Sequence, residues 1–208
     1  MLQQITGPAV EPVTVVDMRL HSAITDTAQD SNLLVYIAAA RAYAESWCGR
    51  SFITQTWKRT LNSFPGRATQ GYVPFGEEDS VPDNAILLDR GPVISVDSIV
   101  YTAMDGSNPT LAPTEYVSEL SGCPGIVTPV FGKIWPIPLP QIGAVRVSYT
   151  AGYGPNPIDV PAGIRHWIMM RVATIFENRE EVAILARGKI EPLPYVDSLL
   201  DPYRVVLA

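Results

Sequence analysis

The stretch QDSNLLVYIAAARAYAESWCGRSFITQTW, residues 29–57, decides the fold because it holds a complete helix, its stop signal and the start of a strand. The short side chains of Asp30 or Ser31 can accept hydrogen bonds from the first unpaired N–H groups of a helix. Gly49 is the residue type that commonly ends a helix in the left-handed conformation. The apolar residues between them recur near the helical period and predict one buried stripe, made of Leu33, Ile37, Ala40, Ala44 and Trp47.

Directly after this helix the sequence changes to the period of a strand. Ile53, Trp57 and Leu61 share one side of an extended segment, and polar residues occupy the other side. Most of the chain from Ile53 to Tyr153 reads as short strands and turns, and Asp105-Gly106 carries the signature of a tight hairpin turn. The spacing is typical of a β-sandwich or a small barrel. The predicted strands after Leu61 cover residues 85–88, 93–101, 115–120, 125–130 and 144–149.

Helical patterns occupy both ends of the chain. Thr14 is the expected cap of a short helix that runs to about Leu20. Near the other end, Asp159 is the expected cap and Pro161 fits the first turn. The late helix should end around Asn178, and its broad apolar face comprises Ile164, Trp167, Ile168, Arg171, Val172, Ile175 and Phe176. The last residues, PLPYVDSLLDPYRVVLA, contain three prolines and an apolar end, and they predict an extended arm.

The order of helices, strands and helix predicts an α+β protein. In this arrangement the N- and C-terminal helices pack as a small helical bundle, because each presents an apolar stripe that needs a partner, and an antiparallel β-domain is inserted between them. The expected helical domain comprises residues 1–50 and 155–190, the inserted β-domain comprises residues 51–154, and an extended C-terminal docking arm comprises residues 191–208.

Composition limits the classes of function. The chain has 208 residues, of which 47% are hydrophobic and 17% charged, so it can bury a core. Its formal charge of -6 and pI of about 4.9 disfavour binding of nucleic acid through a broad basic face. Cys48 and Cys123 lack metal-ligand spacing and are interpreted as free thiols. No secretory signal or membrane-spanning run is visible, so we expect a cytoplasmic chain that binds no membrane.

The sequence shows no pattern of residues that indicates catalysis, a cofactor or a metal. His21 and His166 are the only histidines, and neither has a second ligand at a suitable spacing. The acidic run 77–79 is interpreted as a solvated loop. The proline-rich run 135–140 could be a docking ligand, although a rigid crossing with Trp135 in the core is favoured. We therefore predict no catalytic, cofactor-binding or metal site.

Several motifs match, in order, the head-tail connector (adaptor) proteins of tailed phages and gene transfer agents, which this chain resembles over nearly its whole length. The matching segments are AARAYAESWCGR (39–50), QTW (55–57), LLDRGPVISVDSIVY (87–101), WP (135–136), VRVSYTAGYG (145–154), VP (160–161), ENRE (177–180) and LLDPYR (199–204).

The resemblance implies a structural virion protein. Members of the family form a ring, commonly a dodecamer, beneath the portal protein, extend the DNA channel and carry a stopper or tail-completion protein. The chain is then expected in the host cytoplasm before assembly and in the virion neck afterwards, and DNA passes its lumen without sequence-specific binding. Aromatic, aliphatic and arginine side chains dominate buried interface centres, so the expected portal anchors are Leu199, Leu200, Tyr203 and Arg204. A possible subunit interface is formed by Glu177, Arg179 and Glu180, which otherwise pair on a wet surface.

Other functions stay open from the sequence. Within the same neck the chain could be a stopper or tail-completion protein. A β-rich binding module is a different class, and it would need an exposed aromatic patch, for example at Tyr72, Phe75 and Trp135. A small hydrolase would need paired carboxylates in one cleft.

Overall fold

A computed structural model describes residues 1–66, 81–177 and 194–205. The chain divides into two compact units. The first, here called the β-unit, contains Met1–Pro8 and Thr54–Tyr153. The second, here called the helical unit, contains Ala9–Ile53 and Gly154–Val205. The predicted mixture of helices with antiparallel sheets is confirmed, and the sheets of the described residues do not close into a barrel.

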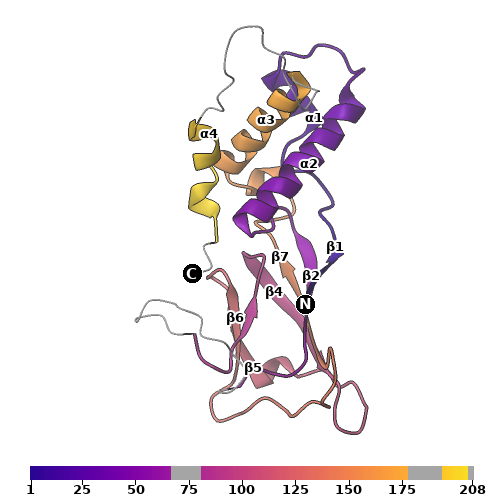
Figure 1. The fold of residues 1–208 in the computed structure, drawn as a ribbon, viewed down its shortest axis with the longest axis vertical. Coiled ribbons are helices and arrows are strands. Elements are labelled where there is room, and N and C mark those ends of the chain that lie inside the picture. The colour runs from indigo at the N-terminus through magenta and orange to yellow at the C-terminus, as the bar shows by residue number, and fades with distance from the viewer. Residues whose placement is uncertain (67–80, 178–193, 206–208) are drawn as a thin grey trace. The chain divides into compact units, whose positions relative to one another are not determined.

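The β-unit holds two antiparallel sheets (Figure 1). The larger has the order β1-β2-β7-β4, and the smaller has the order β3-β6-β5. The strands are β1 (Leu2–Thr6), β2 (Gln55–Leu61), β3 (Ile86–Leu88), β4 (Val93–Tyr101), β5 (Tyr116–Glu119), β6 (Gly125–Pro129) and β7 (Val145–Ala151). A short 3-10 helix, Pro113–Glu115, leads into β5.

The two sheets share one hydrophobic core. Strand β7 alternates between buried and half-buried side chains along its whole length, as a strand with one wet face does. Its buried residues pack in the same cluster as Ile99 of β4, Leu88 of β3 and Val127 of β6. Trp135 joins this core, where it is 8% exposed and its ring stacks on Phe64 at 4.9 Å. The predicted core position of Trp135 is therefore confirmed.

The N-terminus differs from the prediction, which assigned residues 1–50 to the helical domain. Leu2–Thr6 instead forms strand β1 and pairs antiparallel with β2, with Leu2 opposite Arg59. The physical reason is that β2 would otherwise present unpaired backbone N–H and C=O groups at the sheet edge, which an adjacent extended segment can satisfy.

The helical unit contains α1 (Val15–His21), α2 (Asp30–Cys48) and α3 (Ala162–Glu177), followed by the short α4 (Pro194–Ser198) (Figure 1). Two 3-10 helices, Pro157–Asp159 and Asp201–Tyr203, complete it. Helices α2 and α3 contact each other along their apolar faces, and α1 contacts both. The predicted capping of α1 by Thr14 is confirmed, because its hydroxyl accepts from the Asp17 N–H at 3.1 Å.

Helix α2 shows which parts of its predicted stripe are buried. Leu33, Ile37, Ala40 and Ala44 are buried, but the last buried position is Cys48, while Trp47 is 42% exposed. The reason is geometric, because Cys48 lies one turn after Ala44 on the same face and Trp47 lies on the flank. Gly49 ends the helix with φ +68°, as predicted.

The predicted caps of α2 and α3 are wrong. Helix α2 begins at Asp30 after Gln29, without a side-chain cap, and the Asp30 carboxylate instead faces Arg19 of α1 at 3.6 Å. Before α3, Asp159 closes the 3-10 helix by accepting from the Asn156 N–H at 2.8 Å. This carboxylate lies so close to Gly154 that a methyl group there would clash with it, which explains the glycine.

Candidate functional site

Among the described residues, the candidate metal ligands do not come together as a metal site. In the described ranges no group of three or more His, Cys, Asp or Glu side chains lies close enough to hold a metal ion. The rings of His21 and His166 meet edge to face at 6.1 Å on the helical unit. Over the same residues, no helix is long and apolar enough to span a membrane. The acidic run 77–79 and the aromatic residues Tyr72 and Phe75 lie outside the described ranges, and Trp135 is buried.

A charged cluster lies in the β-unit, at the segment that joins β3 to β4. The guanidinium of Arg59 on β2 forms an ion pair with Asp89, whose carbonyl accepts from the Tyr149 hydroxyl at 2.8 Å. Arg90 follows with φ +65°, and its guanidinium lies 5.5 Å from the ring centre of Trp57. Burial raises the pKa of Tyr149 well above its usual value. These contacts fix the joint between the sheets, which is a structural role.

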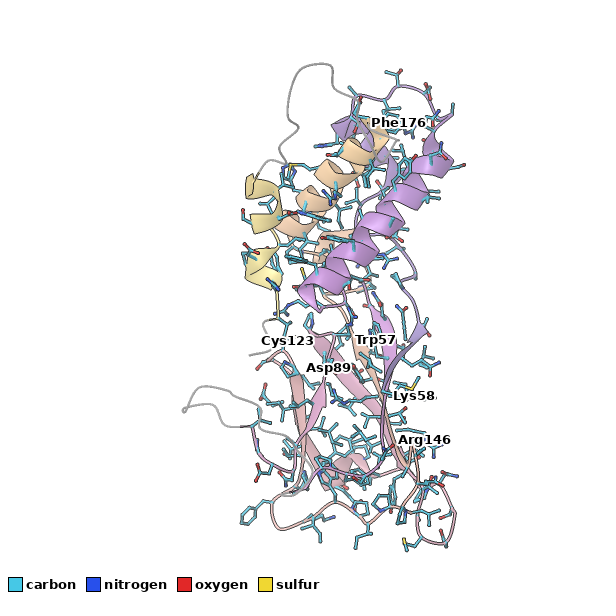
Figure 2. The ribbon with its side chains drawn as sticks, in the orientation of Figure 1. Trp57, Lys58, Asp89, Cys123, Arg146 and Phe176 are labelled. Atoms are coloured by element: carbon cyan, nitrogen blue, oxygen red, sulfur yellow. The ribbon has the colours of Figure 1, made fainter. Side chains whose placement is uncertain are left out.

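The outer face of the β2–β7 pair in the larger sheet is polar. Lys58 lies opposite Ser148, and Arg146 lies opposite Thr60, so both cations stand among hydroxyl side chains (Figure 2). Arg146 also donates to Asn108. With only two cations on this stretch, the face lacks the dense basic surface that grips a phosphate backbone.

The predicted extended arm is wrong for residues 194–205. Pro194–Ser198 forms α4, Asp201–Tyr203 forms a 3-10 turn, and the segment packs on its own helical unit. Leu200 is 1% exposed, and the Trp167 indole of α3 donates to Asp197 at 3.2 Å. The reason is hydrophobic, because burial of Leu200 on the unit's own core stabilises a segment that the prolines alone would leave extended.

The end of α2 receives this C-terminal segment. Arg50 Nε donates to the Tyr203 carbonyl at 2.6 Å, and the Val205 N–H donates to the Cys48 carbonyl at 2.9 Å. The second bond satisfies one of the carbonyls that a helix leaves unpaired at its C-terminus. Burial raises the pKa of the Cys48 thiol to about 11.

Aromatic rings continue this contact across the surface of α2 and α3. Tyr43 stacks on Trp47 at 6.4 Å and on Trp167 at 5.8 Å. The Arg204 guanidinium lies 4.8 Å from the centre of Trp47, which is close enough for a cation–π interaction. Arg171, predicted on the apolar face of α3, is exposed and lies over the rings of Tyr43 and Trp167 at 5.8 Å.

The four predicted portal anchors are therefore in different environments. Leu200 is buried, Leu199 and Tyr203 are half-buried, and Arg204 is exposed over Trp47. For the predicted subunit interface, Glu177 is the exposed last residue of α3, while Arg179 and Glu180 lie outside the described residues.

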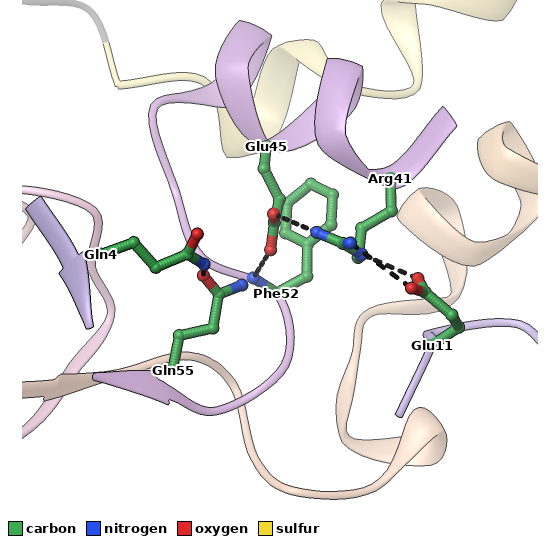
Figure 3. Close-up of polar contacts among 6 residues, drawn as sticks. All are labelled: Gln4, Glu11, Arg41, Glu45, Phe52 and Gln55. Atoms are coloured by element: carbon green, nitrogen blue, oxygen red, sulfur yellow. Dashed lines mark hydrogen bonds and ion pairs between the residues drawn. The ribbon is translucent and has the colours of Figure 1, made fainter. Parts of the chain in front are cut away.

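A buried charge network, which the sequence did not predict, fixes the other side of α2 (Figure 3). Arg41 donates to Glu11 at 2.7 Å and to Glu45 at 2.8 Å, and Glu45 also accepts from the Phe52 N–H at 2.8 Å. Burial lowers the pKa of Arg41, but bonds and charges of Glu11 and Glu45 outweigh it, so the net pKa is raised. Only the i,i+4 spacing of Arg41 and Glu45 was visible in the sequence.

The sequence also did not predict the apolar side chains that the β-unit exposes. Phe131, Ile134, Ile137 and Ile142 lie in the connection from β6 to β7, and each is between 77% and 102% exposed. A signal existed, because these residues are interspersed with Gly and Pro in a stretch that cannot bury all of them. Exposed apolar residues gathered on one loop are typical of interaction surfaces.

Comparison with known proteins finds similar chains among solved structures, and the similarity is one of fold. No family model matches the sequence, and no curated protein matches it. A chain in the neck of an empty gene transfer agent particle, computed with C6 symmetry, has a TM-score of 0.75 at 20% identity, covering 99% of this chain and 96% of that chain. A chain in the virion of the native particle gives the same values. A chain in the native neck computed with C12 symmetry gives a TM-score of 0.67 at the same identity and coverage. The predicted resemblance to this class of particle proteins is thus confirmed for the fold.

Proposed function

We propose that this chain is a structural component of the neck of a tailed particle, a phage or a gene transfer agent, and specifically its head-tail connector. The observation that carries the proposal is the fold match with a neck chain, which covers 99% of this chain and 96% of that chain. Because nearly all of both chains takes part, the match includes both the helical unit and the β-unit rather than one common module.

The proposed assembly is a ring of identical copies, with twelve as the expected number. The use of C6 and C12 symmetry for the necks that contain similar chains supports rotational repetition. DNA would pass through the lumen of this ring. A formal charge of -6 supports a channel wall that does not retain DNA, since each bound phosphate requires a cation. Glu177, with Arg179 and Glu180, is proposed to contact the neighbouring copy.

Portal binding is proposed for the C-terminal segment while it stays folded on the helical unit. Leu200 acts as the internal anchor that holds the segment on the helical unit, and the accessible parts of Leu199, Tyr203 and Arg204 contact the portal protein. The stopper or tail-completion protein is proposed as the partner on the tail side.

Deletion of the gene tests this function. In a strain that produces the particles, the account predicts DNA-filled heads without tails, and it predicts that the restored gene returns the tails. Normal numbers of tailed particles in the deletion strain would contradict the proposed function.

Binding of the purified chain to purified portal rings separates the role of adaptor from that of stopper or tail-completion protein, because an adaptor binds the portal directly. A chain that binds heads only after another neck protein is added would be a stopper or tail-completion protein instead.

A further inference from the structure

The β-unit carries an apolar tip, defined here by Phe131, Ile134, Ile137 and Ile142 of the β6–β7 connection together with Met104 of the turn after β4. Met104 is 64% exposed, and the other four are more exposed still. The two connections are bonded to each other, because the Leu139 N–H donates to the Thr102 carbonyl at 2.8 Å. The two loops that carry the tip are therefore joined at this point.

The tip is held in place by its scaffold. The Trp135 indole inserts into the core and donates to the Asn84 carbonyl at 2.6 Å, and Gly143 N–H donates to the Asn62 side chain at 3.1 Å. Prolines at 136, 138 and 140 restrict the backbone between these two points. A surface whose backbone is already ordered loses little conformational entropy on binding, which favours a docking role.

The tip lies at the end of the sheet away from the connections to the helical unit. Gln55 pairs with Ala151 at the end where β2 begins and β7 ends, next to the unit boundaries at Thr54 and Tyr153. Leu61, Val145 and Tyr101 lie at the opposite end, where the tip loops leave the sheet. Seven residues of strand separate the two ends, roughly 20 Å. The tip thus lies at the end of the larger sheet opposite the strand ends that adjoin Thr54 and Tyr153.

The tip carries little net charge. The two loops of the tip, residues 102–108 and 130–143, contain two charged residues, Asp105 and Lys133. Lys133 forms an ion pair with Glu115 at 3.2 Å, and Asp105 accepts from the Ser107 N–H at 2.9 Å and from its hydroxyl at 2.6 Å. A partner surface must then be apolar and nearly uncharged, because an unpaired charge would be desolvated without compensation.

We infer that the apolar tip docks on an apolar, uncharged protein surface of the next neck component, presented there in several copies. This inference rests on the proposed function. The five side chains of the tip are few beside the roughly 20–30 residues that each partner contributes to a standard stable interface. One tip therefore binds weakly. A ring of tips on a ring of partners binds tightly by multivalency, which favours this occupant over a single second copy.

The test compares two triple variants in the particle-producing strain. The tip variant is Phe131→Ser, Ile134→Ser and Ile137→Ser. The matched control replaces exposed apolar residues of the helical unit, Val16→Ser, Leu20→Ser and Ile158→Ser, which are 55%, 77% and 71% exposed. Thermal unfolding of both purified variants checks that they fold. A second tip variant, Phe131→Asp, alters one fully exposed side chain and covers the case in which the triple variant does not fold.

The probes are purified heads, examined for this chain by immunoblot and for tails by electron microscopy. The inference predicts that the tip variant stays on the heads while tails are lost, and that the control keeps its tails. Tailed particles in normal number with the tip variant would overturn the inference while the neck function stands. Two other results would indicate that a second copy of this chain occupies the tip, and either would overturn the inference. The first is that the tip variants are missing from the heads. The second is that the wild-type chain self-associates in sedimentation and that the variants do not. Loss of tails in the control variant would also overturn the inference. Absence of the wild-type chain from particles would instead refute the proposed function.

Discussion

At the scale of single residues, polar groups buried in the helical unit hold its elements together. Glu45 is 8% exposed; one of its oxygens accepts from Arg41 within α2, and the other accepts from the Phe52 N–H and holds α2 to the chain that follows it. Removing one member of a buried charged network leaves the others desolvated without their partner.

Replacement of Glu45 by Ala should therefore lower the free energy of unfolding by about 3 kcal/mol. The measurement is urea denaturation at neutral pH, followed by circular dichroism at a wavelength that reports helix. The control is Glu177→Ala, an exposed residue at the end of α3, which should change the free energy by less than about 0.5 kcal/mol. Equal effects of the two substitutions would contradict the role assigned to Glu45.

Cys48 should make the stability depend on pH in the alkaline range. Its pKa is raised from 9.0 to about 11 in the folded chain because the thiol is buried. The unfolded chain releases this proton near pH 9, whereas the folded chain retains it to about pH 11. Stability that is complete below pH 9 is then lost as the pH rises toward 11, by up to about 1.4 kcal/mol per pH unit.

Urea denaturation at several pH values between 8 and 10.5 measures this slope. Cys48→Ala should flatten it, and Cys123→Ala, which removes the half-exposed cysteine, should keep it. A slope that is unchanged in Cys48→Ala would show that other groups, such as the buried hydroxyl of Tyr149 whose pKa is also raised, cause the dependence.

Residue-level prediction from sequence succeeded where a local rule determines the outcome. Thr14 and Gly49 satisfy capping rules that depend only on a few neighbouring residues. It failed for Asp30, because Arg19 of another helix competes for the carboxylate. It also failed at Trp47, which lies on the flank of α2, where Tyr43 stacks on its ring and Arg204 of the C-terminal segment lies over it.

At the scale of elements, the strands between residues 85 and 151 were predicted from short apolar or β-branched runs between turn signals. Clear alternation was present in the last of them, β7. Strand β1 and the folded C-terminal segment were not predicted. Both are short and need a partner distant in sequence, respectively β2 and the end of α2, so their own residues give little signal. The exposed apolar tip is a similar case, because a periodic pattern does not show which loop residues stay outside.

The C-terminal segment is expected to contribute to the stability of the helical unit. Leu200→Ala should lower the free energy of unfolding by about 3 kcal/mol, because it removes a fully buried side chain and leaves a cavity. Urea denaturation measures the change, with Leu20→Ala on the exposed side of α1 as the control near zero. A change below about 1 kcal/mol for Leu200→Ala would indicate that the segment is only loosely attached.

The same packing changes what truncation experiments mean. Removal of Val196–Ala208 would delete Leu200 and the bond from Val205 to Cys48, so it should destabilise the helical unit as well as remove the proposed portal contact. Substitution of exposed Arg204 is the cleaner test of portal binding, because its guanidinium lies on the surface over Trp47.

At the scale of the whole molecule, the proposed function makes the helical unit and the β-unit together the repeating subunit of a neck. The fold of both units was predictable from the sequence because their elements follow helical and strand periods, and their order resembles that of the head-tail connector proteins. The copy number and the contacts between copies depend on surfaces whose partners lie in other chains. The sequence of one chain therefore could not specify them.

The most direct measurement is a cryo-electron microscopy reconstruction of the neck of particles purified from the strain that encodes this chain. The account predicts that density between head and tail fits this chain in rotationally repeated copies, with the C-terminal segment at the portal and the apolar tip on the next component. Purified tailed particles that lack the chain, or that carry it anywhere other than the neck, would contradict the account.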